Sequence, residues 1–287
     1  MAKGLPQINI DATDINYGTV FPFNQDQFDL ICSDLTSFPV ARAVAASNGF
    51  PVIFAPINLT DYASDCAPRV PQWVVQAESA PPLSREHYLA HIARLYLDPG
   101  RTSYVHLMDG GISDNLAMRG MINAVLSYSA DFAAYQANVL HIRRILAISV
   151  DGQAAANSSW PKQRSISGLG QIFEAVSGAQ IDAYNFETLL LAKDIVTSFA
   201  DQLRKLRCQR SAIIDGARCD DVRGYFIHLS LDDIADPAVR ERLQSIATGL
   251  TIPNDDVDLL IRAGETVVRD STELKEFKRE IGTAPAS

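Results

Sequence analysis

The stretch Tyr104-Val105-His106-Leu107-Met108-Asp109-Gly110-Gly111 is an apolar run that ends in an aspartate, and two glycines follow that aspartate. A helix-like stretch begins almost at once, at Ser113. In α/β folds, the side chains at the carboxyl ends of strands form the sites where ligands bind and chemistry takes place. The stretch therefore predicts a strand that presents the Asp109 carboxylate as a candidate catalytic group.

The composition is that of an acidic globular protein. Of 287 residues, 47% are hydrophobic and 21% are charged, so we expect one large domain, with disorder only in the tail after Gly282. There are 25 basic and 34 acidic residues, and no basic stripe is interleaved with aromatics, which argues against nucleic acid as a partner. No apolar run approaches the ~18 residues that span a bilayer, and residues 1–6 lack the pattern of a signal peptide. The compartment therefore stays undetermined.

Helices alternate with strands along most of the chain, a pattern that predicts an α/β fold with a largely parallel sheet. The sequence contains no internal repeat. The expected strands are Ile8–Thr13, Thr19–Phe23, Pro51–Ile57, Tyr104–Met108, Arg143–Val150 and Tyr225–Leu231. The expected helices are Val40–Ser47, Ser84–Leu97, Ser113–Ser127, Gly168–Arg207, Pro237–Ala247 and Asp255–Val268.

Two segments add detail to this pattern. The polar, proline-rich stretch from Asp61 to Pro82 is expected to be a loop or a cap. The long helical segment from Gly168 to Arg207 is expected to bury one apolar stripe. That stripe comprises Ile172, Val176, Ile181, Leu189, Leu190, Ile195 and Phe199.

Three Asp-Gly pairs are candidates for the functional carboxylate, at Asp109, Asp151 and Asp215. Each can equally be an ordinary turn, in which the aspartate bonds its own backbone and the glycine adopts positive φ. Only Asp109 has both a strand before it and a helix start after it. Asp109 is thus the preferred candidate, and the turn interpretation stays open for all three.

The sequence offers no partner for this carboxylate. No Gly-x-Ser-x-Gly motif occurs, and Ser47 and Ser113 each have glycine on only one side. Ser113 is better explained as a helix cap and Ser47 as a packing residue. His87 and His91 lack both the intervening glutamate and a third ligand, so neither a metal nor a cofactor is predicted.

The four cysteines lack the close spacing of a zinc site. Cys208 and Cys219 flank one short polar loop. Both a disulfide between these two and a pair of free thiols fit this spacing.

Several spaced segments together resemble the patatin-like phospholipases, and they cover nearly the whole chain. They suggest the carboxyl-terminal part of the catalytic domain in a bacterial branch of that family. They are Asp11–Gly18, Ser33–Pro56, Met108–Asn115, Ile181–Thr188 and the terminal helix that begins at Ile252-Pro253-Asn254.

The resemblance implies a three-layer α/β fold with a mostly parallel central sheet whose amino-terminal strands are missing, and a helical carboxyl-terminal extension. Residues 1–155 would be the carboxyl part of the catalytic domain, and residues 156–287 a helix-rich extension packed on it. In that family a serine in Gly-x-Ser-x-Gly attacks an ester, and the aspartate of Asp-Gly-Gly is its base without a histidine. Only Asp109, with Gly110 and Gly111, carries over, because the serine and the oxyanion turn would lie before residue 1.

The resemblance thus implies a lipid acyl hydrolase of the Ser-Asp type that here lacks its serine. A base without a hydroxyl to deprotonate performs no acyl transfer, so a catalytically inactive scaffold or binding module is the alternative. A conventional triad, in which Asp109 orients His141 or His228, is a third interpretation. The implied partners are a lipid or other ester substrate, with peripheral membrane contact, in the cytoplasm or the bacterial cell envelope. We also expect self-association through an uncovered sheet edge.

Overall fold

The computed structural model describes residues 8–51, 53–66, 69–127, 139–153, 164, 168–246 and 251–282. The chain forms a mixed α/β structure in which two compact units can be distinguished, residues 1–132 and 133–287. Each unit has its own sheet and its own apolar core. The division falls before the predicted boundary at residue 155, because strand β5 belongs to the second unit.

Unit 1 is built on a four-stranded sheet in the order β2-β1-β4-β3, and every neighbouring pair is antiparallel. The turn between β1 and β2 spans only residues 15–18, and so short a connection forces the two strands to run antiparallel. In β1 the last three residues are all buried. The strands are β1 (Asp11–Asp14), β2 (Thr19–Pro22), β3 (Ile57–Thr60) and β4 (Tyr104–Met108).

Helices surround this sheet, and an aromatic cluster forms much of the core. Phe21 is fully buried and contacts Phe28 and Tyr96 edge to face. A disulfide joins Cys32 to Cys66. The helices are α1 (Gln25–Leu30), η1 (Leu35–Ser37), α2 (Val40–Ser47), α3 (Ala63–Cys66), α4 (Gln72–Ala77), α5 (Arg85–Leu97), α6 (Gly111–Asp114) and α7 (Arg119–Ser127).

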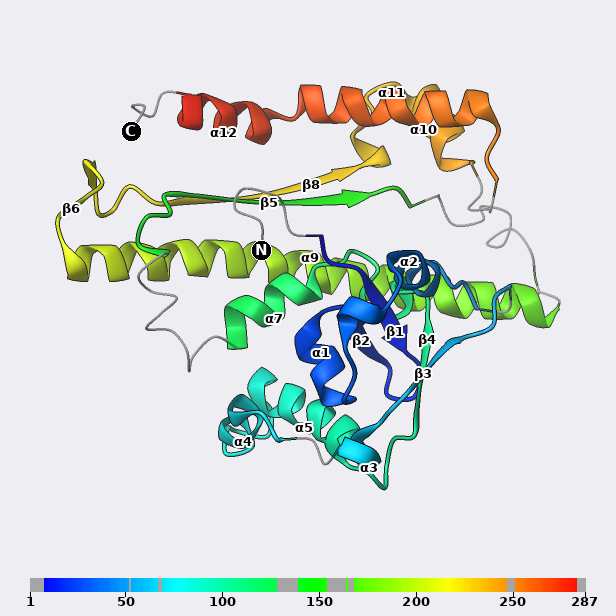
Figure 1. Cartoon of the computed structure of the whole chain (residues 1–287). Coiled ribbons are helices and arrows are strands. Elements are labelled where there is room, and N and C mark those ends of the chain that lie inside the picture. The colour runs from blue at the N-terminus through cyan, green and yellow to red at the C-terminus, as the bar shows by residue number, and fades with distance from the viewer. Residues whose placement is uncertain are drawn as a thin grey trace. The chain divides into compact units, whose positions relative to one another are not determined.

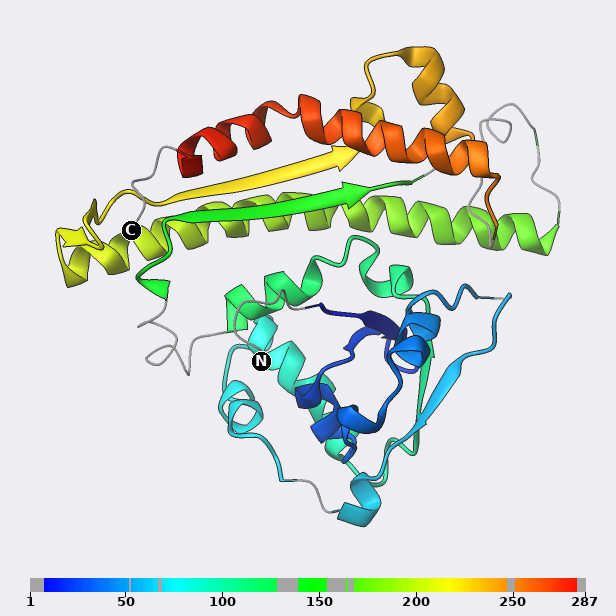
Figure 2. The ribbon, with the colours of Figure 1, turned by 45° about the horizontal axis from the view of Figure 1, so that its top comes forward.

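Unit 2 is a three-layer arrangement around two parallel strands, β5 (Arg144–Asp151) and β8 (Arg223–Ser230), which pair over their full length. Helix α9 (Leu169–Arg210) lies on one face, while α11 (Asn254–Asp270) and α12 (Thr272–Gly282) lie on the other (Figures 1 and 2). The remaining elements are the hairpin β6 (Ile213–Ile214) and β7 (Ala217–Arg218), the turn η3 (Leu231–Asp233) and α10 (Pro237–Gln244).

Gly224 explains how closely α9 lies against β8. A β-carbon at this position would be 2.8 Å from the carbonyl oxygen of Val196. Only glycine leaves room for the helix backbone at this distance. The alternating residues Ile227 and Leu229 of β8 pack on the opposite face of the sheet, against Leu274 of α12.

The structure corrects four expectations. The sheet of unit 1 is antiparallel, and only β5 and β8 are parallel among the described strands, because alternation of helices and strands does not fix strand direction. The strand expected from Pro51 to Ile57 is also wrong: residue 51 and residues 53–56, which the structure describes, form no strand, and β3 begins only at Ile57. The stretch from Asp61 to Pro82 contains α3 and α4.

The fourth correction concerns the helix expected over Ser113–Ser127, which is two helices. Ala117 adopts a left-handed conformation with φ of 51° between α6 and α7. The Asp114 carboxylate accepts hydrogen bonds from the backbone N–H groups of Met118 and Arg119, at 3.2 and 2.7 Å. Asp114 thus caps the start of the second helix, and this local bonding replaces the continuation of the first.

Candidate functional site

The loop after β4 holds Asp109 through its backbone. The N–H of Asp109 donates to the carbonyl of Gly49 at 3.1 Å, and the N–H of Gly110 donates to that of Ser47 at 3.0 Å. Both acceptors lie at the carboxyl end of α2 and just beyond it. The Asp109 loop is therefore fixed between the end of strand β4 and the end of helix α2.

Thr13 is the second anchor of the loop. Its side chain is fully buried in β1, and its hydroxyl donates to the carbonyl of Asp109 at 2.7 Å. The same oxygen accepts the N–H of Ser113 at 3.2 Å and lies 2.8 Å from the Ser113 hydroxyl. Because Thr13 has one proton and gives it to Asp109, Ser113 must donate its own hydroxyl proton to Thr13. Ser113 therefore stabilises this loop through its bonds to Thr13. The sequence predicts that Ser113 caps a helix, and this prediction is wrong because Ser113 lies inside α6.

Gly110 is required by space, and Gly111 leaves room for neighbouring side chains. A β-carbon on Gly110 would lie 2.7 Å from the carbonyl oxygen of Asp11. One on Gly111 would lie 2.9 Å from Oδ1 of Asn115 and 3.0 Å from Oδ1 of Asp109. Neither glycine is among those with positive φ. The two glycines thus allow the loop to approach β1 and its own side chains.

The Asp109 carboxylate has one occupied and one open oxygen. Its Oδ1 accepts the N–H of Gly111 at 2.8 Å, while no described residue donates to Oδ2. The side chain is half-buried, and burial raises the pKa of its carboxyl above 3.8, against the lowering effect of the Gly111 bond. A carboxylate held in this way can accept a proton at Oδ2 from a group brought to it.

Further carboxyl groups lie close to the loop. Burial raises the pKa of Asp11, and the neighbouring charge of Asp114 adds to that effect. Burial also raises the pKa of Asp114, which caps α7. The Asp14 carboxylate accepts the Tyr96 hydroxyl at 2.8 Å. The carboxylates of Asp14 and Asp114 accept hydrogen bonds that hold the fold, whereas no described residue donates to the carboxylate of Asp11. Asp109 differs from Asp11 in that one of its oxygens is held by a backbone N–H group while the other stays open.

Of the other two Asp-Gly pairs, the one at Asp215 is a turn. Asp215 and Gly216 have φ of 52° and 72° and join β6 to β7, as in a type I′ hairpin turn. Oδ1 of Asp151 accepts the N–H of Gln153 at 2.9 Å, and most of the loop expected beyond it lies outside the described residues. The turn interpretation holds for Asp215. Asp109 also bonds its own backbone, but without the positive φ of an ordinary Asp-Gly turn.

The predicted histidine candidates fall at separate places. Nδ1 of His141 lies 2.6 Å from Oδ2 of Asp215, so its described carboxylate partner is Asp215. Nδ1 of His228 is buried on β8 without a described partner. His87 is half-buried and His91 is exposed. Within the described ranges, no three His, Cys, Asp or Glu residues are grouped as metal ligands, and no helix combines the length and apolarity needed to cross a bilayer.

The cysteines and one buried arginine belong to the scaffold. Cys208 pairs with Cys219 in a disulfide, which decides between the two alternatives left by the sequence. Arg207, fully buried beside it, donates to the carbonyl oxygens of Cys219 and Leu140. These bonds tie the end of α9 to the β6–β7 hairpin and to the segment before β5.

Thr13 is the residue of this site that sequence reasoning missed. It occupies a polar position of the alternating first strand, a pattern that predicts exposure. The structure buries it completely because Asp109 and Ser113 close over it. The two glycines after Asp109 could have indicated that this loop lies close to another backbone, since glycine allows two backbones to approach.

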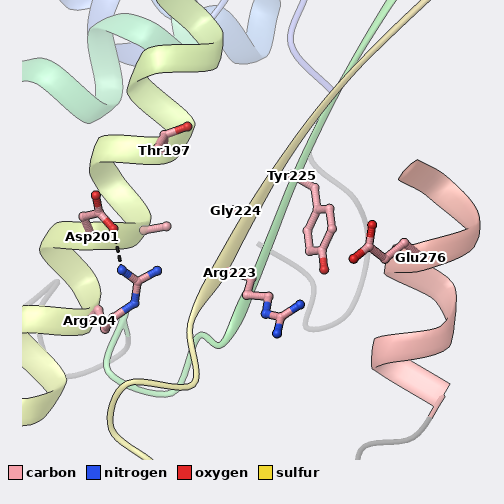
Figure 3. Close-up of a pocket in the computed structure, with 8 residues that line it drawn as sticks. Thr197, Asp201, Arg204, Arg223, Gly224, Tyr225 and Glu276 are labelled. Carbon is pink, nitrogen blue, oxygen red and sulfur yellow. Dashed lines mark hydrogen bonds and ion pairs between the residues drawn. The ribbon is translucent and has the colours of Figure 1, made fainter. Parts of the chain in front are cut away.

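A shallow hollow of about 230 Å³ lies in unit 2 and contains none of the predicted site residues (Figure 3). Residues of α9, β8 and α12 line it, among them Arg204, Arg223, Tyr225 and Glu276. Arg204 is paired with Asp201 at 2.5 Å, and Arg223 with Glu280. With its cations already paired and its volume below the ~300 Å³ of ordinary ligand sites, this hollow is a weak candidate.

Comparisons of the chain with models of protein families, with curated proteins and with solved structures find no match.

Proposed function

We propose that this chain carries the general base, Asp109, of a patatin-like acyl hydrolase that acts on lipid or other carboxylic esters. The proposal rests on the geometry of the Asp109 carboxyl group: the N–H of Gly111 holds Oδ1, and Oδ2 is left open. Its surroundings agree with the proposal, because Gly110 stands where a larger residue would collide with the backbone of β1. The nucleophilic serine would come from a segment upstream of Met1.

In the proposed reaction, Oδ2 of Asp109 takes the proton of the serine hydroxyl as the serine oxygen attacks the ester carbonyl. The protonated Asp109 then gives this proton to the departing alcohol, which leaves an acyl-enzyme. In the second half, Asp109 takes a proton from water as the water oxygen attacks the acyl-enzyme. It then gives this proton to the serine oxygen, which leaves as the free hydroxyl while the acid is released. Such proton transfers contribute about 10² to 10⁴ in rate.

The raised pKa of Asp109 suits this role and sets the direction of its pH dependence. Burial brings the pKa upward toward neutral pH, which makes the carboxylate a stronger base. Only the deprotonated form accepts the proton. Activity should therefore rise with pH through a pKa above 3.8 and then level off.

The finer architecture is also part of the proposal. We infer that β5 and β8 belong to a larger parallel sheet that continues beyond the free edge of β5. Ile148 and Val150 of this strand are 41% and 73% exposed, although a strand with apolar side chains at such positions is normally covered. An upstream segment that added parallel strands at this edge, together with the helices that connect them, would cover this face.

Labelling with a fluorophosphonate, which reacts with activated serines, tests the proposal. The 287-residue chain should remain unlabelled, and the chain extended upstream along its reading frame should be labelled at one serine. In the extended chain, Asp109→Ala should slow labelling by at least about 100-fold. Unchanged labelling of that variant would remove Asp109 from the mechanism.

A non-enzymatic binding module is the second candidate function. It is favoured by the absence of Gly-x-Ser-x-Gly and by the Ser113 hydroxyl of this loop, which already donates to Thr13. The same labelling experiment separates the candidates. An extended chain that binds lipid but takes up no fluorophosphonate would support the binding module.

A further inference from the structure

Helix α9 has two apolar faces, although the sequence predicts one. Ala192, Ile195 and Val196 are at least 96% buried, and Val196 lies against Gly224 of β8. Ile172 and Val176 are 45% and 61% exposed. Ile172 and Ile195 lie about 140° apart around the helix, so they do not share a stripe.

The exposed face lies along the amino-terminal half of α9, and the first turns of this half extend beyond the sheet. The helix has 42 residues and is about 63 Å long, whereas β5 and β8 have 8 residues each and span about 26 Å. Figure 2 shows the amino-terminal part of α9 continuing past the ends of both strands. We call its exposed apolar positions the α9 seam: Ile172, Val176, Ala179, Ala183, Phe186 and Leu190.

The α9 seam has the spacing of a helix–helix interface. Its members follow one another at intervals of four, three, four, three and four residues, the heptad spacing of paired helices. All six side chains are exposed, and Phe186 and Leu190 are 60% and 46% exposed. A regular apolar stripe of this kind in water indicates a surface that another helix covers.

The order of residues along the seam identifies the partner. The pairs Ile172 and Leu190, Val176 and Phe186, and Ala179 and Ala183 are all centred on position 181. We propose that the α9 seam binds the α9 seam of a second copy of this chain, antiparallel and about a two-fold axis at this position. Each large side chain then meets a large one, and the two alanine pairs let the helix centres approach closely.

The charges of the segment agree with this register. From Ile172 to Leu190 the charged residues are Glu174, Asp182 and Glu187. In the antiparallel register, Glu174 falls opposite Thr188, Asp182 opposite Gln180 and Glu187 opposite Ala175. No carboxylate falls directly opposite another. In a parallel register each would face its own copy, and like charges would oppose association.

A contact of this length is small for a stable dimer. The seam extends for about 27 Å, which corresponds to the lower end of specific interface sizes. We therefore expect a dimer with a dissociation constant in the micromolar range. Sedimentation velocity on the whole chain between about 1 and 200 µM should show a monomer that converts to a dimer.

A charge exchange across the axis tests the register. Val176→Glu and Phe186→Lys should each raise the dissociation constant by at least about 100-fold, because each buries a charge without a partner. Mixed in equal amounts, the two variants should form a heterodimer within about tenfold of the original affinity. The introduced carboxylate of one copy would then face the introduced ammonium group of the other only if the helices are antiparallel in this register.

Controls keep the outcomes distinct. Gln202→Glu adds the same charge at an exposed position of α9 outside the seam and should leave the dimer unchanged. Circular dichroism should show all variants folded. Three results would overturn the proposal: a monomer at all concentrations, a dimer lost in Val150→Lys but kept in both seam variants, or a monomer whose seam variants lose binding to phosphatidylcholine vesicles.

Discussion

The two loops at Asp109 and Asp215 share an Asp-Gly sequence but use it for different purposes. At Asp215 both residues have positive φ, the carboxylate is exposed, and the loop reverses the chain between β6 and β7. At Asp109 the glycines have no positive φ, and any side chain on Gly110 would collide with the backbone of β1. Gly216 is needed because its backbone adopts positive φ, whereas Gly110 is needed because the backbone of β1 lies too close for a side chain.

This difference distinguishes a turn from a candidate site. The hairpin turn at Asp215 satisfies local geometry, and its carboxylate bonds an exposed histidine. The Asp109 loop is held by α2, by Thr13 and by its own Gly111, yet its Oδ2 has no described donor. Such rigid positioning of a carboxylate with an open oxygen is what a catalytic base requires.

The largest stability difference is expected between alanines at the two glycines. Gly110→Ala should lower the free energy of unfolding of unit 1 by about 3 kcal/mol, because the Asp11 backbone must move. Gly216→Ala should cost about 1 kcal/mol through positive φ alone, and Gly216→Asn should restore most of it. Urea denaturation measures both free-energy costs. Hydrogen exchange in β4 and in β7 shows which of the two loops each variant disturbs. Equal costs at the two positions would contradict the distinction.

The hairpin at Asp215 should depend on its disulfide, and the Asp109 loop should not. Cys208 and Cys219 are 11 residues apart in sequence. Replacing both with serine should cost about 2–3 kcal/mol, from the loop entropy of the unfolded chain. Hydrogen exchange should accelerate in β6 and β7 and stay unchanged in β4. Faster exchange around Asp109 in this variant would show that the two loops are coupled.

Asp61 provides a buried counterpart to Asp109. Its Oδ1 accepts the N–H of Ala63 at 2.8 Å, its Oδ2 has no described partner, and burial raises its pKa to about 6. Its folded pKa lies above the ordinary value of 3.8, so the stability it confers is present below that pH and lost as the pH rises through about 6. Asp61→Asn should therefore stabilise the protein by about 1–2 kcal/mol at pH 8. Urea denaturation at about pH 4 should show no gain, and a gain of equal size there would contradict the raised pKa.

Local patterns predicted most of the elements. The strand before Asp109, the helix from Ser84, the strands around Ile148 and Ile227 and the long helix α9 all form near the expected places. Their signals are short-range, since periodicity and capping residues act within a few turns. The position of Asp109 at the end of β4 was predictable for the same reason.

Other features depend on contacts that a single sequence does not show. Strand direction in unit 1 follows from which strands meet, and the sequence pattern is the same for parallel and antiparallel neighbours. The burial of Thr13 follows from a loop 100 residues away. The prediction merged the two faces of α9 into one stripe, because the sequence does not show which side of the helix the sheet covers. Whether the two units form one domain stays a prediction.

The most direct test of the central claim compares the two aspartates in the chain extended upstream along its reading frame. Hydrolysis of a carboxylic ester should be measured for Asp109→Ala and for Asp215→Ala under the same conditions. We predict that Asp109→Ala lowers kcat/KM by about 10² to 10⁴, whereas Asp215→Ala stays within about twofold of the parent. A loss of equal size in both variants, or none at Asp109, would contradict the account.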